Sequence, residues 1–246
     1  MTEPEWTVLV PVQILEGETV PDAVIDALTG LPVVVLGYHV LPEQTPPGQA
    51  RMQFEEPAQT KLDDLAAAFG ERGASCETRL VFTHDEEQTL DRVAEETGAD
   101  AVLIPNPAAR IERLLVPIGG EVDADRITAF VAALIGARNV DVTLFHAAET
   151  EAARDAGQSR LDDVRGLLTD RGVDADAVRT EVTTSEHPIR AISTAAADHD
   201  AVIMGESEPS LRAFLFGEAP EQVAAQSLGP VVVVRRPRDS DAGDEG

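Results

Sequence analysis

The chain repeats itself, and the repeat limits its possible folds more than any other feature. Three short apolar segments recur in the same order, at offsets of 106, 107 and 100 residues. The clearest pair is Asp100–Pro105 (DAVLIP) and Asp200–Gly205 (DAVIMG). Three matches in register indicate the duplication of one unit of about 110 residues. The other two pairs are Val8–Val12 with Leu114–Ile118, and Val35–His39 with Val142–His146.

Each unit alternates short apolar runs with longer amphipathic stretches. In the second unit, Leu114–Ile118 is too short for a helix and predicts a strand, whereas Asp123–Arg138 has apolar residues at helical spacing. The alternation continues to a run of four valines, Val231–Val234. Apolar strands separated by helices are typical of a parallel sheet covered on both faces. We therefore predict an α/β fold of two Rossmann-like units, each a parallel sheet with helices on both faces.

The first unit is shorter than the second, because it ends before the last helix and strand. It follows the second unit as far as Pro105 and has no counterpart of Glu206–Arg235. We therefore expect a truncated first domain over residues 1–109, a second domain over 110–238 and an acidic tail over 239–246. Since an open sheet edge is a hazard that proteins cover, we expect the two units to pack closely.

Two stretches lie outside the alternation of strands and helices. Leu41–Thr60 contains four prolines, which indicates a loop, either a flap over a site or an insertion, and we favour an insertion. The end of the chain, Arg236–Gly246, is polar and contains glycine, which predicts a disordered tail.

The charge of the chain excludes several classes of function. There are 45 acidic and 19 basic residues, which gives a net charge of −26. Such a surface repels nucleic acid and anionic membranes, so we expect neither as a partner. The longest apolar run, Ala129–Ala137, is too short to span a bilayer, and the first six residues do not resemble a signal peptide. We expect a cytoplasmic protein that does not insert into a membrane.

Several segments occur in an order that carries a family resemblance. They are Val116-Pro117-Ile118, the strand ending at His146, Asp200–Gly205, Gly217, and Gly229-Pro230 directly before Val231–Val234. In this order they resemble the universal stress protein family, and the chain from Trp6 to Arg236 resembles a tandem pair of such domains with the first one trimmed. The resemblance implies a five-stranded parallel sheet of adenine-nucleotide-binding type in each unit. Many members pair through the last strand, so we expect a homodimer through Val231–Val234.

Nucleotide-binding members of that family have a glycine-rich phosphate loop after the fourth strand. Its pattern is Gly, two residues, Gly, nine residues, Gly, then Ser or Thr, because bare backbone N–H groups and a hydroxyl can approach phosphates. In this chain Gly205 and Gly217 fit. However, Glu208 replaces the second glycine, the spacer is one residue short, and Glu218 replaces the hydroxyl. A carboxylate about 4 Å from a phosphate charge costs roughly 4 kcal/mol at an effective dielectric constant of about 20.

The acidic residue that the family places after the first strand, beside adenine and ribose, is also missing. Gln13 occupies the matching position in the first unit and Gly119 in the second. We expect no cofactor, and ATP is the alternative that the remaining frame leaves open. Plain turn formation explains the remaining glycines equally well. The residual nucleotide frame that we predict consists of Gly205, Gly217, Ile118, His146 and Arg212.

No residue pattern points to catalysis or to a metal site. The five histidines are scattered, and Cys76 has no histidine near it in the sequence. His39 and His146 end matching strands at the edge where such sheets bind ligands, so each either contacts a ligand or makes a structural hydrogen bond, and we favour the hydrogen bond. We therefore predict a non-enzymatic stress-response or regulatory protein. The alternatives are a protein that binds ATP or AMP in the second unit, and an accessory protein that docks on a transporter or another partner.

The basic residues indicate a salt-adapted protein, because Lys61 is the only lysine and the other 18 are arginine. Excess carboxylate with almost no lysine suits molar salt, where a Debye length of about 3 Å screens surface repulsion. In dilute buffer the same charge destabilises the compact state.

We predict that the protein needs roughly molar KCl or NaCl to stay folded, because only then is its self-repulsion screened. Circular dichroism during stepwise removal of salt measures this dependence. A melting temperature that stays constant from about 3 M to about 0.1 M salt would contradict the salt-adapted interpretation.

Overall fold

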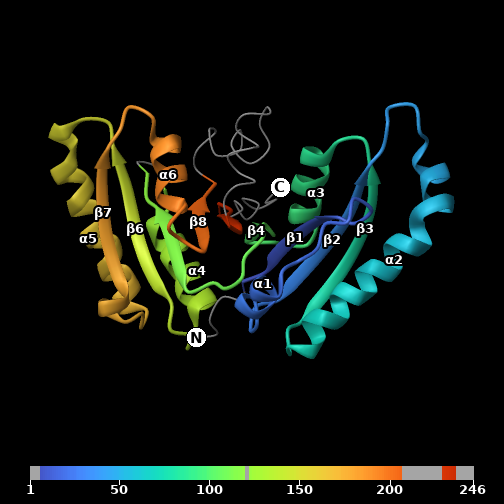
Figure 1. The fold of residues 1–246 in the computed structure, drawn as a ribbon, viewed down its shortest axis with the longest axis horizontal. Coiled ribbons are helices and arrows are strands. Elements are labelled where there is room, and N and C mark those ends of the chain that lie inside the picture. Colours follow the sequence, from blue (N-terminus) through green and yellow to red (C-terminus); the bar gives the residue numbers. More distant parts are fainter. Residues whose placement is uncertain (1–5, 120–121, 207–228, 237–246) are drawn as a thin grey trace, which may run out of the picture.

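The computed structural model describes residues 6–119, 122–206 and 229–236, and its strands form one nine-stranded sheet (Figure 1). The last helix, which the sequence predicts between Glu206 and Val231, and the acidic tail 239–246 lie outside these residues. The strands are β1 (Val8–Gln13), β2 (Val33–Val40), β3 (Cys76–Thr83), β4 (Ala101–Ile104), β5 (Arg113–Pro117), β6 (Asp141–Ala148), β7 (Val178–Thr184), β8 (Ala201–Gly205) and β9 (Val231–Val234). The helices are α1 (Asp22–Ala27), α2 (Pro47–Glu71), α3 (Glu86–Glu96), α4 (Ala124–Ile135), α5 (Arg154–Asp170) and α6 (Pro188–Ala196), with short 3-10 turns at Glu151–Ala153 and Ala175–Ala177.

The order of the strands repeats within the sheet. The full order is β3-β2-β1-β4-β9-β8-β5-β6-β7, so that β1–β4 and β5–β8 follow the same scheme from opposite edges. Every neighbouring pair is parallel except β4 and β9, which are antiparallel. The predicted α/β class, with parallel strands and helices on both faces, is therefore confirmed.

Strand β9 belongs to both halves of the sheet. On one side Val231 and Val234 pair with Ile104 and Ala101 of β4, and on the other side β9 runs parallel to β8. The expectation that the two units pack closely is confirmed, because β9 covers the open edge of β4. The predicted homodimer through Val231–Val234 is wrong, because both edges of this strand are already paired within one chain. The first unit lacks a fifth strand of its own, and β9 of the same chain reaches that edge at a far higher effective concentration than a second molecule could.

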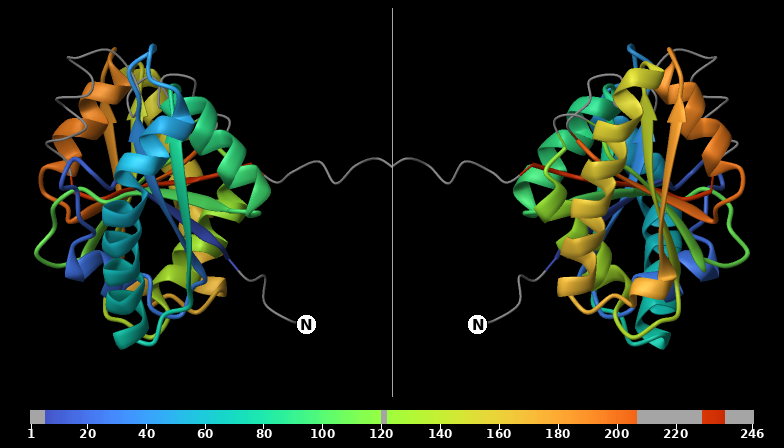
Figure 2. Two further views of the ribbon diagram at one scale, coloured as in Figure 1. Left: turned by 90° about the vertical axis from the view of Figure 1, so that its right-hand side faces the viewer. Right: turned by 90° about the vertical axis from the view of Figure 1, so that its left-hand side faces the viewer.

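The helices cover the two faces of the sheet unequally. Helices α1, α2, α4 and α5 lie on one face, and α3 and α6 lie on the other (Figures 1 and 2). On the first face one apolar core runs through both halves, from Ile25 and Leu62 to Phe130 and Leu168. Two smaller clusters pack α3 and α6 against the opposite face. No helix among the described residues is long and apolar enough to cross a membrane.

The stretch Leu41–Thr60 is mostly helical, which corrects the expectation of an inserted loop. Helix α2 begins at Pro47, in the first turn, where a proline loses no hydrogen bond. Only Pro57 lies inside the helix. The neighbouring Ala58 is fully buried in the core, so packing outweighs the lost backbone hydrogen bond.

Two equivalent aspartates tie the fourth strand of each half to the first. Asp200 accepts hydrogen bonds from the backbone N–H of Glu112 and Arg113, at 3.1 and 2.9 Å, and its other oxygen lies 2.9 Å from the Arg113 guanidinium. Burial opposes ionisation of Asp200, but these donors hold its pKa below its usual value. Asp100 accepts in the same way from the backbone N–H of Thr7, at 3.1 Å.

The guanidinium that pairs with Asp100 comes from the other half of the chain. Arg126, in the first turn of α4, lies 2.8 Å from the Asp100 carboxylate and donates to the Arg235 carbonyl oxygen at 2.6 Å. The same guanidinium lies 5.0 Å from the centre of the Trp6 ring, which packs edge-on against Phe130. Arg126 therefore joins the first half, the second half and the end of β9.

We predict that Arg126→Leu lowers the free energy of unfolding by about 2–3 kcal/mol, because it leaves the half-buried Asp100 carboxylate without its charged partner. Arg92→Leu is the matched control: it breaks an exposed ion pair with Glu96 on α3 and is expected to cost less than about 0.5 kcal/mol. Urea denaturation at high salt measures both. Equal losses in the two variants would contradict the role assigned to Arg126.

Candidate functional site

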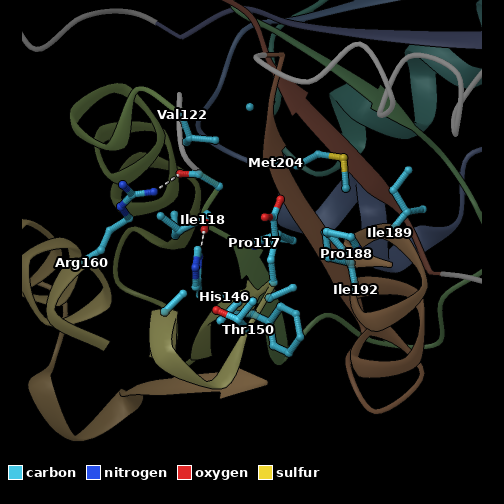
Figure 3. A pocket seen from close by; sticks show the side chains of 17 residues that line it. Pro117, Ile118, Val122, His146, Thr150, Arg160, Pro188, Ile189, Ile192 and Met204 are labelled. Atoms are coloured by element: carbon cyan, nitrogen blue, oxygen red, sulfur yellow. Dashed lines mark hydrogen bonds between the residues drawn. The ribbon is translucent and has the colours of Figure 1, made fainter. Parts of the chain in front are cut away.

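A cavity of about 420 Å³ lies at the carboxyl ends of β5, β6 and β8 (Figure 3). Open α/β sheets bind their ligands at this edge. Most of its wall is apolar, and α6 contributes three side chains, those of Pro188, Ile189 and Ile192. The main apolar lining residues are Pro117, Ile118, Phe145, Ile189, Ile192 and Met204.

One wall of the cavity is the imidazole ring of His146. Its Nδ1 lies 2.7 Å from the carbonyl oxygen of Ile118, so in the neutral ring this nitrogen carries the proton and donates (Figure 3). The backbone N–H of Ile118 in turn donates to the Phe145 carbonyl oxygen at 2.8 Å. The expected structural hydrogen bond at His146 is confirmed, and it fastens the end of β6 to the chain leaving β5.

An arginine that the sequence analysis did not single out lies at the rim. Arg160, on α5, donates to the carbonyl oxygen of Gly119 at 2.9 Å (Figure 3). The first half has a similar arrangement, since Lys61 on α2 donates to the carbonyl oxygen of Ile14 at 3.0 Å. Both cations stand one residue before a buried leucine of their helix, and this shared position is the sequence signal that could have revealed Arg160.

Strand register shows which residues of the first half correspond to the cavity. Pro11 pairs with Leu36, and its counterpart Pro117 pairs with Phe145. His146 therefore corresponds to Gly37, which corrects the expected match of His146 with His39 by two residues. Short valine-rich strands align almost equally well in neighbouring registers of the same parity, so the sequence match alone could not exclude the shift.

The same register places Tyr38 of the first half where the cavity has Ala147. The Tyr38 hydroxyl donates to the carboxylate of Glu86, at the start of α3, at 2.6 Å. Burial and this carboxylate raise the pKa of Tyr38 far above its usual value. In the second half α6 starts with Pro188 instead, so this half has neither the tyrosine hydroxyl nor the carboxylate of this hydrogen bond. The small Ala147 side chain leaves room for the cavity.

A further carboxylate, that of the exposed Glu18, lies at this end of the first half. Partial desolvation raises the pKa of Glu18, and the hydrogen bond that it accepts from the backbone N–H of Gln13 opposes the rise. Gln13 stands where the sequence resemblance places an acid, so the acidic group here comes from the following loop instead.

Of the five predicted frame residues, the structure brings three together. Ile118, His146 and Gly205 line the cavity. Gly217 and Arg212 lie outside the described residues, as do Glu208 and Glu218. Among the described residues, no cluster of three or more His, Cys, Asp or Glu side chains is arranged to hold a metal ion.

Sequence comparison assigns the family. The model of the universal stress protein family matches residues 110–235, just over half of the chain. The chain therefore belongs to the universal stress protein family. A search of curated proteins found no significant match.

Structure comparison supports the fold. A universal stress protein from Archaeoglobus fulgidus DSM 4304 has a TM-score of 0.63 at 14% identity, covering 95% of this chain and 97% of that chain. The cytoplasmic domain of a prokaryotic cation chloride cotransporter has a TM-score of 0.51 at 11% identity, covering 93% of this chain and 95% of that chain. A universal stress protein from Archaeoglobus fulgidus in complex with dAMP has a TM-score of 0.39 at 16% identity, and covers 50% of this chain and 95% of that chain. At these identities the first two likenesses show the fold alone.

Proposed function

We propose that this chain is a non-enzymatic regulatory protein of the stress response whose nucleotide site has degenerated into an apolar cavity. The observation that carries the proposal is the composition of the cavity wall. Its position and volume suit a small organic ligand, but most of its surface is apolar and comes from Ile, Pro, Phe, Met, Val and Ala side chains. Gly119 offers no carboxylate to adenine or ribose, in contrast to the acid found there in the nucleotide-binding members that the sequence resembles.

The residues at the end of β8 support the proposal that the protein binds phosphate only weakly. Glu206 directly follows Gly205, and its carboxylate accepts a hydrogen bond from the backbone N–H of Arg236 at 2.9 Å. A second interaction brings this carboxylate to 3.9 Å from Nε of Arg235. Glu206 does not line the cavity, but it places a carboxylate directly after Gly205, where the resembled family binds phosphate, and a like charge there opposes phosphate binding. Glu208 and Glu218 would add to this repulsion.

Two polar side chains of the described lining, His146 and Arg160, are engaged in structural hydrogen bonds, which supports a non-enzymatic function. His146 uses Nδ1 for the Ile118 carbonyl, and Arg160 donates to the Gly119 carbonyl. Catalysis by a general base needs a nucleophile within hydrogen-bond reach of that base. In the lining, Thr150 carries the side-chain hydroxyl, and the neighbouring Glu149 is exposed. Neither residue is buried, so the site provides little desolvation to activate them.

We further propose that the chain is a tandem of a truncated first domain (residues 1–109), a second domain (110–238) and an acidic tail (239–246). The repeated strand order and the missing fifth strand of the first half support this division. The net charge of −26 with a single lysine supports a salt-rich cytoplasm as its place of action. A partner protein would then respond to whether the cavity in the second domain is empty or occupied.

We predict that Mg-ATP binds no tighter than about 1 mM, which corresponds to only about 4 kcal/mol of binding free energy. Gly119→Asp restores a charged carboxylate with two acceptor oxygens and is expected to strengthen adenosine binding about tenfold, whereas Gly119→Asn, of equal size but with one neutral acceptor, is the control and should strengthen it clearly less. Isothermal titration at high salt measures these affinities.

A variant with a closed cavity locates any binding that remains. Ala147→Tyr copies the first half and is expected to abolish whatever adenosine binding the second half retains. Micromolar binding of Mg-ATP by the unaltered chain would contradict the proposal and favour the alternative, an ATP- or AMP-binding protein that uses the second domain.

A further inference from the structure

Each half of the protein has one glycine where the second strand meets its covering helix. In the first half this glycine is on the strand, and in the second half it is on the helix. In the first half it is Gly37 on β2, and a Cβ built there would lie 2.9 Å from the Leu62 side chain of α2. In the second half the corresponding strand position bears His146, and the glycine is Gly157 on α5. The exchange places an imidazole ring beside the cavity in the second half alone.

The fit between His146 and Gly157 leaves no room for a methyl group. A Cβ built on Gly157 would lie 2.4 Å from Cδ2 of His146, 3.1 Å from Nε2 and 3.3 Å from Cγ. All three atoms belong to the ring, and Gly157 itself is buried. Real Cβ atoms essentially never approach other heavy atoms to less than 3.0 Å, so any side chain at this position displaces the ring.

We infer that Gly157 is the residue that keeps the cavity open, because it gives the His146 ring a niche on α5 and so lets Nδ1 reach the Ile118 carbonyl. The inference rests on the proposed function only in taking this cavity to be the ligand site. The ring lines the cavity on one side and contacts α5 on the other. A ring displaced from α5 therefore moves into the cavity and gives up its hydrogen bond.

Helix propensity alone disfavours a glycine at position 157, because glycine lowers the stability of a helix. A glycine inside a helix is about 1 kcal/mol less favourable than alanine. The same helix contains a second glycine, Gly166, which is exposed and has no atom within 4 Å of a Cβ built on it. Gly157→Ala and Gly166→Ala thus gain the same propensity, and they differ in the contact with His146.

The test compares these variants by NMR at high salt, with indole as a flat, uncharged probe of the cavity. In the unaltered chain and in Gly166→Ala, the ¹⁵N imidazole spectrum of neutral His146 should show the Nδ1–H tautomer, and indole should shift the amide signals of Ile118 and Met204. Gly157→Ala is expected to lose the hydrogen-bonded Nδ1–H signal and to bind indole at least about tenfold more weakly. The double variant Gly157→Ala with His146→Ala should recover indole binding, because the displaced ring is then absent.

Several outcomes would overturn the inference. Gly157→Ala with an unchanged His146 spectrum and unchanged indole affinity would show that the niche is not needed. A double variant that fails to recover binding would show that the effect does not pass through His146, and an unaltered chain that does not bind indole would show that the open cavity admits no such ligand. These results are independent of ATP affinity, so the proposed function can fail while this inference holds, or the reverse.

Discussion

The structure depends on the pairing of one four-residue strand with both halves of the chain. The backbone of β9 is hydrogen-bonded to β8 in parallel and to β4 in antiparallel orientation, so a single run of valines satisfies the edges of both. Gly229 permits this placement, because a Cβ there would lie 2.2 Å from the backbone oxygen of Asp200 at the start of β8. The first half can therefore dispense with a fifth strand, and one apolar core continues beneath the junction.

Sharing a strand leaves the two halves free to differ at their carboxyl ends. The first half fills the position of the cavity with Tyr38, which Glu86 fastens to α3. In the second half Ala147 and Pro188 leave this space open, and His146 forms a wall supported by Gly157 and the Ile118 carbonyl. The repeated strand order thus provides a sheet that is common to both halves, and the second half adds a cavity.

Much of the fold is predictable from the sequence because it depends on local patterns. Apolar runs and helical spacing indicate the order of strands and helices, and the missing fifth strand indicates that the halves pack closely. The partner of Val231–Val234 is a non-local choice, since four valines predict a buried strand without saying which edges it joins. The register of β2 on β1 and of β6 on β5 is also non-local, and comparing the two registers shows that His146 corresponds to Gly37 and not to His39.

The candidate site was predictable only where it coincides with strand ends. Ile118, His146 and Gly205 follow from the position of the strands, whereas Arg160 and Gly157 act through contacts of α5 with other elements. The helical part of Leu41–Thr60 was missed because its prolines suggest a loop, while Ala58 and Leu62 are held by burial in the core.

Amide hydrogen exchange of β9 tests the shared strand most directly. Arg235 donates its N–H to the carbonyl oxygen of Asp100 at 2.8 Å, and alternation along a strand places the N–H of Val233 on the same side, toward β4. The amides of Val232 and Val234 face β8. If β9 joins both halves, Val232, Val233 and Val234 exchange at similarly slow rates, close to the rate of global unfolding. Fast exchange of Val233 and Arg235 beside slow exchange of Val232 and Val234 would show that β9 is an open edge, and would contradict the account.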